Sequence, residues 1–228
     1  SRFMPFYAYD TNDLNGNRVH IDSWLVSRHT RGEPFCKVCQ NELNICAVHT
    51  PAQAPHYCHF HGTNCPTIQR NAEPYQHLDN VLQNDEAETE NKNQIRLKLH
   101  KIFNKCKGVC VNLNFTEFRE LFDIASQYNI WAYVNVNVEH IPYILLTCRD
   151  YFRSRSPYRT ESFYFVFSPV HGLDGLWIQP EGQADLLFRV NRNTHDIDPI
   201  TIYFDLDNYS NESELNDYTV NYILNILE

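Results

Sequence analysis

The most regular pattern of apolar positions in the chain is a helical one, between residues 86 and 105. Apolar side chains recur there at i, i+4, i+7 and i+8, which predicts one buried face of an amphipathic helix: Ile95, Leu99, Ile102 and Phe103. Asn114 and Glu117 have the spacing of an N-cap and its reciprocal N3 partner, so they predict the start of a second helix. Two further helices are expected over residues 138–154 and 213–227.

Shorter apolar runs bounded by Gly, Pro and Asn predict strands. Near the N-terminus, residues 5–10 and 18–22 flank Asn15-Gly16, a dipeptide typical of a hairpin turn. A strand is also expected within residues 42–49. Further strands are expected at 109–113, 131–136, 162–167, 176–178, 185–190 and 200–204. Strands interleaved with helices indicate a mixed α/β layer after the N-terminal part.

Cysteine and histidine are concentrated in one stretch, residues 35–66, which holds five of the eight cysteines and four of the eleven histidines. Cys36 and Cys39 form a C-x-x-C motif, and His56 and His59 repeat that spacing as H-x-x-H. Two such pairs commonly build a tetrahedral zinc site, because a tight turn directs both side chains of a pair at one metal. Thiolates with imidazoles favour zinc over magnesium or calcium.

The spacing leaves the ligand set open. Cys36 and Cys39 are the expected first pair, and the second is either His56 with His59 or His59 with Cys65. We therefore expect four ligands from these five residues. Other residues that could replace one of them are Cys46, His49, Cys58 and His61. A Cys36–Cys39 disulfide is not expected, since it would close a very small, strained loop.

The first 66 residues, under a third of the chain, resemble a known family. The motifs are Ala8-Tyr9-Asp10, an Asn-Gly turn, Val19-x-Ile21-Asp22, the C-x-x-C pair and His56-Tyr57-Cys58-His59, ending near Asn64-Cys65-Pro66. They look like the zinc-ribbon N-terminus of the CoiA-like competence proteins and related bacterial zinc-ribbon proteins, in which the histidine motif is His-Phe-Ala-His. The resemblance implies a bacterial protein linked to DNA processing in DNA uptake, mobile elements or phage defence. It also implies that a restriction-endonuclease-like domain follows the ribbon.

Taken together, these patterns predict a chain of α+β or α/β class with two domains. Residues 1–72 are expected to form a small zinc ribbon, made of a β-hairpin and zinc knuckles. Residues 73–228 are expected to form a mixed α/β domain, restriction-endonuclease-like under the resemblance. A proline-bounded segment, residues 66–74, would link them.

Three aspartates are the candidate catalytic residues of such a nuclease-like domain: Asp185, Asp205 and Asp207. Nucleases of this kind use two carboxylates to hold Mg²⁺ and an amine or amide to position water. Asp205 and Asp207 would point the same way if the strand continued through them. Asp207 stands where the amine or amide is needed, so we expect a degenerate site, with Mg²⁺ bound only if the site is active. The alternative is that residues 205–208 end a strand and enter a turn.

Charge restricts the expected partners. The net charge is −9, divided as +1 over residues 1–72 and −10 over the remainder. An acidic chain does not attract nucleic acid as a whole, so DNA binding would need a local basic patch. The candidate residues are Arg96, Lys98, Lys101 and Lys105 on the first predicted helix, and Arg149 and Arg153 beside aromatic residues. The alternative is a solvated helix face neutralised by nearby acidic residues.

Two functions follow from these observations. The first is a CoiA-like zinc-binding protein linked to DNA processing, with a degenerate nuclease-like domain. The second is a non-enzymatic protein–protein interaction module stapled by structural zinc. No apolar run reaches about 18 residues, so no membrane partner is expected. The cysteines, without a visible secretion signal, favour a reducing cytoplasm and metal binding over disulfides.

Overall fold

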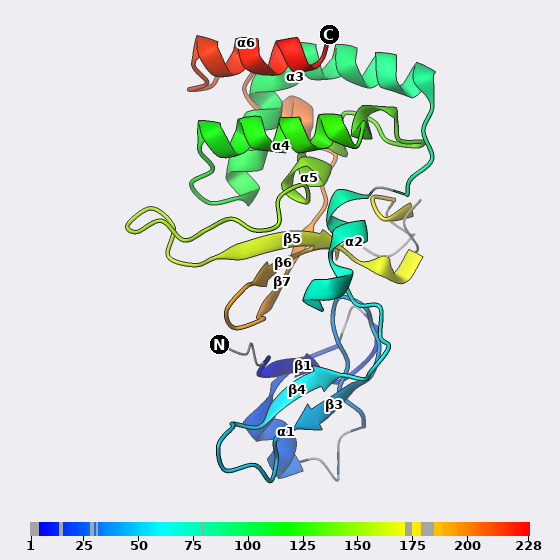
Figure 1. Cartoon of the computed structure of the whole chain (residues 1–228), viewed down its shortest axis with the longest axis vertical. Coiled ribbons are helices and arrows are strands. Elements are labelled where there is room, and N and C mark those ends of the chain that lie inside the picture. Colours follow the sequence, from blue (N-terminus) through cyan, green and yellow to red (C-terminus); the bar gives the residue numbers. More distant parts are fainter. Residues whose placement is uncertain are drawn as a thin grey trace.

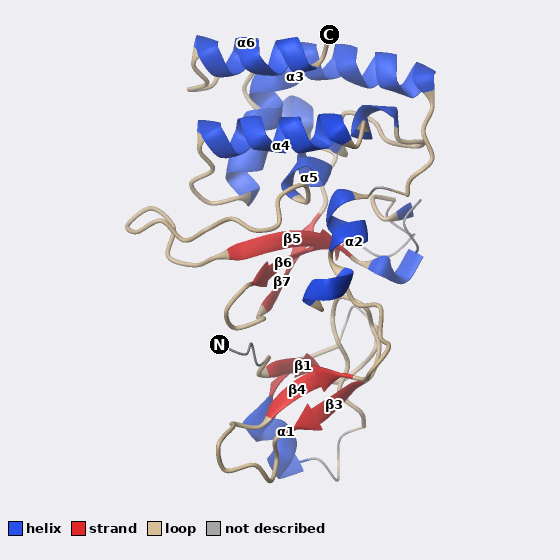
Figure 2. Ribbon diagram, in the orientation of Figure 1, coloured by secondary structure: helices blue, strands red, loops and turns tan. Residues whose placement is uncertain are grey.

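The computed structural model describes residues 5–13, 16–27, 30, 32–78, 80–171, 175–178 and 185–228. Over these residues the chain is mixed α/β, and its strands form three small antiparallel sheets. The elements stack in three tiers along the longest axis: an N-terminal module, a middle sheet and a helical layer that holds the C-terminus (Figures 1 and 2). Among the described helices, none has both the length and the apolar composition that a membrane span requires.

The N-terminal module contains two hairpins. Strand β1 (Tyr7–Tyr9) pairs with β2 (Arg18–His20), which confirms the expected hairpin, and the short helix α1 (Ile21–Ser27) follows. Strand β3 (Leu43–Cys46) pairs with β4 (His56–His59). Phe35 joins the two hairpins, since it bridges both Tyr9 and Glu42.

Residues 66–74, expected as a linker, instead carry regular structure. They include the 3₁₀ helix η1 (Gln69–Asn71) and the start of α2 (Glu73–His77). Pro74 lies in the first turn of α2, where its missing N–H leaves no helical hydrogen bond unmade. Prolines bound this segment without making it irregular.

The helical layer begins with α3 (Asp85–Val109), where the Asn84 side chain accepts a hydrogen bond from the Ala87 N–H. Helix α4 (Phe115–Gln127) starts with the predicted capping box, because Asn114 and Glu117 each bond the other's backbone N–H. The 3₁₀ helix η2 (Ile130–Ala132) and α5 (Ile141–Leu146) follow. Helix α6 (Asp217–Ile226) closes the layer.

Several predicted elements in this half are wrong. Residues 109–113 and 176–178 form no strand, and η2 with turns replaces the strand expected at 131–136. The helix expected over 138–154 is reduced to α5. These runs are apolar because they pack in the core of the helical layer, and a short buried run has no period that separates strand from helix.

The middle sheet contains β5 (Phe163–Phe167), β6 (Asp185–Asn191) and β7 (Ile197–Thr201), in that order and antiparallel. All five residues of β5 are buried because the sheet is covered on both faces. Phe163, Phe165 and Phe167 belong to the core of the helical layer, whereas Tyr164 and Val166 pack with the N-terminal module. The alternation of side chains along one strand therefore joins the two ends of the molecule.

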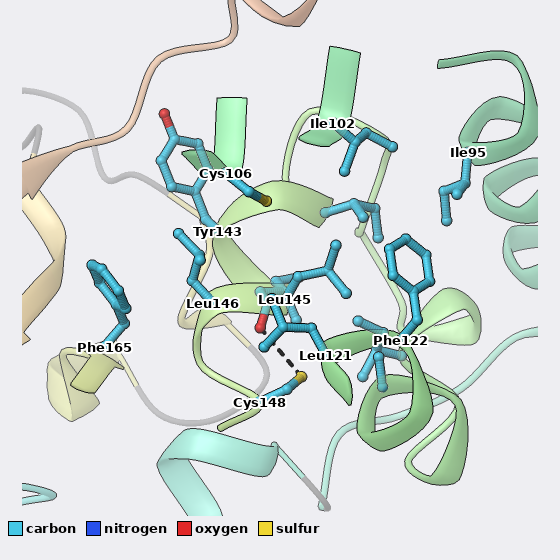
Figure 3. Close-up of a cluster of buried hydrophobic side chains, with 14 of the residues drawn as sticks. Ile95, Ile102, Cys106, Leu121, Phe122, Tyr143, Leu145, Leu146, Cys148 and Phe165 are labelled. Carbon is cyan, nitrogen blue, oxygen red and sulfur yellow. Dashed lines mark hydrogen bonds between the residues drawn. The ribbon is translucent and has the colours of Figure 1, made fainter. Parts of the chain in front are cut away.

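The core of the helical layer is large and mostly apolar. Figure 3 shows side chains of α3, α4 and α5 meeting around Leu145, with Phe165 of β5 nearby. Ile102, Phe122 and Leu145 are fully buried. Burial of each such side chain stabilises the fold by roughly 1.5–3 kcal/mol.

Candidate metal centre

Four side chains converge where the N-terminal module meets the middle sheet: Cys36, Cys39, His59 and Cys65. Their ligand atoms all lie within 4.8 Å of one another. Cys36 Sγ is 3.9 Å from Cys65 Sγ, and Cys39 Sγ is 3.7 Å from His59 Nε2. Zinc–sulfur bonds of about 2.3 Å in a tetrahedron set the sulfurs about 3.8 Å apart. The four residues therefore lie close enough together to hold a metal ion.

The first two ligands are positioned by a tight turn. The Gln40 N–H donates to the Cys36 carbonyl at 2.8 Å, and the Cys36 N–H donates to the Asn41 carbonyl at 3.0 Å. Gln40 itself has a φ of 59°, in the left-handed region. One residue in this conformation reverses the chain after Cys39, so both thiols point to the same side.

The other two ligands flank a second turn. His59 is the last residue of β4, and Gly62, with a φ of 86°, turns the chain toward Cys65. Gly is suited to this position because a Cβ would be strained there. Thr67 Oγ1 lies 3.0 Å from Cys65 Sγ and supplies a polar neighbour to this buried thiol.

His56 is not part of the cluster, so Cys65 is the fourth member. The sequence suggested a knuckle at H-x-x-H, but the segment is strand β4, in which alternate side chains point to opposite faces. His56 and His59 are three residues apart and therefore cannot share a face. His56 lies opposite Cys46, with its Nδ1 3.0 Å from the Ala54 carbonyl.

The protonation of the three thiols depends on their neighbours. Hydrogen bonds from Cys36 and Cys65 hold the pKa of Cys39 far below its usual range. The bond to Cys39 raises the pKa of Cys36, and burial raises the pKa of Cys65 to about 12. Without a cation the cluster thus favours a single thiolate, whereas a divalent metal would offset the charge of all three.

The cluster lies in a buried junction with the sheet. Cys36, Cys39 and Cys65 are 4%, 7% and 0% exposed. Ser168, just after β5, donates its hydroxyl to the Val38 carbonyl inside the C-x-x-C turn at 2.7 Å. Burial and the charges of Cys65 and Cys36 raise the pKa of Tyr164 in β5, which places this phenol beside the cluster.

His195, in the turn between β6 and β7, also lies near the cluster. Burial and then the proximity of His59 lower its pKa, so the neutral imidazole is favoured. Sequence reasoning missed His195, since nothing in its local sequence marks it and it approaches only through the folding of the sheet. Thr67, in contrast, follows Cys65 by two residues and could have been suspected from that spacing.

Two of the cysteines that could have replaced a proposed ligand are joined in a disulfide, whereas the sequence favoured metal binding over disulfides. Cys46 of β3 and Cys58 of β4 are bonded, with their Cα atoms 6.2 Å apart. In the strand register Cys58 lies opposite Asn44, and Cys46 opposite His56, so the bond crosses the hairpin diagonally. His49 and His61, the two histidines that could also have replaced a ligand, are exposed and lie outside the cluster.

The candidate catalytic aspartates lie on different types of structure. Asp185 begins β6, and the placement of its side chain is outside the described part. Strand β7 ends at Thr201, so Asp205 and Asp207 do not share a strand; Asp207 lies in the 3₁₀ helix η5 (Leu206–Asn208). Asp205 pairs with Lys105, and Asp207 pairs with Lys98 at 3.0 Å. The alternation argument that aligned the two carboxylates is therefore wrong.

The basic residues of α3 contact the part of the chain that follows β7. Lys101 donates to the carbonyls of Asp207 and Tyr209 at 3.0 and 2.8 Å. Arg96 donates to the Leu227 carbonyl, and Lys105 is only 1% exposed. Burial alone would lower the pKa of Lys105, but hydrogen bonds to Asp205 and Tyr143 outweigh it and leave the pKa raised. These cations hold the C-terminal segment in place, whereas the sequence suggested either a DNA-binding patch or a solvated helix face.

The second basic cluster divides in two. Arg149 pairs with Glu120 and lies over the Phe152 ring. Arg153 is exposed and lies over the ring of Tyr151, with its Cζ 5.4 Å from the centroid.

Comparison with family models, curated proteins and solved structures gives no match to this chain.

Proposed function

We propose that the chain is a zinc-binding, non-enzymatic binding protein, in which one structural Zn²⁺ holds the two turns of the N-terminal module together beside the middle sheet. The observation that carries the proposal is the convergence of Cys36, Cys39, His59 and Cys65 at a buried junction. Four protein ligands complete a tetrahedron and leave no position for substrate, which is the arrangement of structural rather than catalytic zinc.

The donor set supports zinc in particular. Three thiolates and one imidazole are soft to borderline ligands, which bind zinc well and magnesium or calcium poorly. The Thr67 hydroxyl contacts Cys65 directly, and the Ser168 hydroxyl fixes the turn between Cys36 and Cys39 through the Val38 carbonyl, so both orient the ligands from outside. Each thiol is buried, so a metal is the most direct source of compensation for the charge of the thiolates.

A role in DNA processing rests on the resemblance of the first 66 residues to CoiA-like proteins. The pairing of Asp205 and Asp207 with lysines, and the use of the α3 cations inside the chain, favour binding of a partner over metal-dependent cleavage of DNA. We therefore place the interaction function first and the nuclease-like function second.

Metal analysis tests the proposal. Protein purified without added metal should contain about one zinc per chain, and Cys65→Ser should lose it. His56→Ala is the matched control, because His56 was an equal candidate in the sequence but lies outside the cluster, and it should retain zinc. Loss of zinc in His56→Ala with retention in Cys65→Ser would contradict the assignment, as would a fully folded protein without metal.

A further inference from the structure

Two arginines meet at one phenol ring on the surface between the metal module and the sheet. The Cζ of Arg192 lies 3.4 Å from the centroid of the Tyr151 ring, and the Cζ of Arg153 lies 5.4 Å from it. A hydrogen bond from Arg192, and then the charges of both arginines, lower the pKa of Tyr151. The positive charges of two arginines therefore lie next to the ring of Tyr151.

These two arginines differ from three nearby arginines in their ion pairs. Arg149, Arg159 and Arg189 each form an ion pair with a carboxylate. Within the part of the chain that the structure describes, Arg153 and Arg192 form none. The chain has a net charge of −9, so two guanidinium groups without a carboxylate partner beside the Tyr151 ring form a local positive site that could attract an anion.

A cavity extends from this ring. Tyr151 and Arg192 line a cavity of about 440 Å³ that lies against η1, α2 and β5, a volume in the range of small-molecule sites. Arg153 lines a neighbouring cavity of about 300 Å³, and Tyr151 belongs to both. Arg192 and Arg153 thus line two different cavities that share Tyr151.

The rest of the larger cavity is lined partly by carboxylate and amide side chains. Its lining includes the carboxyl-bearing residues Glu73 and Asp150 and the amide side chains of Gln69 and Gln76. Carboxylates repel a second anionic group but accept hydrogen bonds from hydroxyl and amino groups. The site therefore favours a ligand with one anionic head and a body that carries hydrogen-bond donors.

We propose that the cavity bounded by Tyr151 and Arg192 binds a phosphate monoester of the size of a nucleoside monophosphate or a sugar phosphate. The fork of each guanidinium matches phosphate oxygens in a bidentate manner. Arg192 holds the phosphate and the charge of Arg153, which lines the neighbouring cavity, adds to the attraction, while Glu73 and Gln69 bind sugar hydroxyls or an amino group. The residues that line this cavity include none of the four proposed metal ligands, although Thr67 and His195 lie beside the cluster.

Isothermal titration of the full-length, zinc-loaded protein tests this site, with AMP, ribose 5-phosphate, adenosine and inorganic phosphate as probes. AMP or ribose 5-phosphate should bind more tightly than inorganic phosphate, and adenosine should bind weakly. Arg192→Gln should weaken binding of the tightest monoester roughly tenfold or more, as expected for loss of a charge-assisted hydrogen bond. Arg153→Gln should weaken it less, since Arg153 lines the neighbouring cavity and not this one.

Arg155→Gln is the matched control. Arg155 lies in the same segment, but it donates to the Asn112 carbonyl at 2.7 Å and lies over Tyr158 instead. It should leave binding unchanged, and all three variants should keep their zinc. The proposal is overturned if neither monoester binds at millimolar concentration, if inorganic phosphate binds as tightly as AMP, or if Arg192→Gln binds like the parent protein. A single-stranded oligonucleotide that binds where AMP does not would likewise overturn it, in favour of a nucleic-acid surface.

Discussion

Two groups of three buried cysteines lie in different hydrophobic cores of the molecule, and they differ in what each thiol faces. Cys36, Cys39 and Cys65 face one another and a histidine. Cys106, Cys110 and Cys148 lie in the core of the helical layer, where burial raises the pKa of each, to about 12 for Cys110 and Cys148. Cys148 donates to the Ile144 carbonyl at 3.4 Å, as Figure 3 shows. Burial alone therefore makes a thiol an unreactive apolar side chain, and only convergence makes a metal site.

The two ends also differ in how they are stabilised. The helical layer buries a large set of aliphatic and aromatic side chains from α3, α4, α5 and β5. The N-terminal module buries fewer, and part of its core consists of the proposed metal ligands and of β5 and β6 side chains. A module of about 70 residues with so small a core commonly depends on a metal or a disulfide for stability.

The largest expected effect is that of metal removal. Chelation by EDTA should unfold the N-terminal module and leave the helical layer folded, because structural zinc contributes on the order of 10 kcal/mol to small domains. Tryptophan fluorescence separates the two regions if Trp24 is the only tryptophan retained in one variant and Trp131 in another. Equal loss of both signals on chelation would show that the N-terminal module and the helical layer unfold as one unit, so that metal does not stabilise the module alone.

The next effect should be confined to the helical layer. The Arg159 guanidinium donates two hydrogen bonds to the Glu117 carboxylate, at 2.8 and 3.0 Å. The side chains of Arg159 and Glu117 are 1% and 8% exposed. Removing one charge of a buried pair costs about 3–5 kcal/mol, so Glu117→Gln should lower the free energy of unfolding by that amount. Gln still supports the helix cap.

Glu120→Gln is the control for that variant. Glu120 lies on the same helix and pairs with Arg149, but its side chain is 47% exposed. Loss of an exposed pair should cost less than about 1 kcal/mol in urea denaturation. Similar costs for the two variants would mean that burial does not set the strength of ion pairs in this layer. Both variants should bind zinc normally.

The smallest of the three effects depends on pH. Burial lowers the pKa of His140 to about 4, and its Nδ1 accepts the Asn137 N–H at 3.1 Å. The unfolded chain takes up this proton near pH 6.5 and the folded chain only near pH 4. Stability from neutral His140 is therefore complete above about pH 6.5 and decreases as the pH falls toward 4, by up to about 3 kcal/mol.

His140→Asn keeps an acceptor for the Asn137 N–H and removes the titration. The difference in unfolding free energy between this variant and the parent should shift in favour of the variant as the pH falls from 7 to 4.5. His49→Asn, at an exposed site, is the control for the substitution itself. A constant difference for His140→Asn across this range would contradict the buried, neutral state of the imidazole.

The sequence determined the elements whose signals are local. The period of apolar residues predicted α3, and Asn114 with Glu117 predicted the start of α4. Asn-Gly between two apolar runs predicted the β1–β2 hairpin, and the C-x-x-C motif predicted the Cys36–Cys39 half of the metal cluster. Each depends on hydrogen bonds or turns within a few residues, which local sequence encodes.

Tertiary structure decided what joins distant residues. Cys65 rather than His56 completes the cluster because β4 is a strand, whose alternation turns the two histidines apart. The residues around Trp131 became a 3₁₀ helix and turns because they fill the core beside α3, where burial outweighs strand propensity. Asp205 and Asp207 became partners of α3 lysines because the chain leaves the sheet at Thr201. The pairing of side chains about 100 positions apart depends on how the layers pack, and no local pattern carries that information.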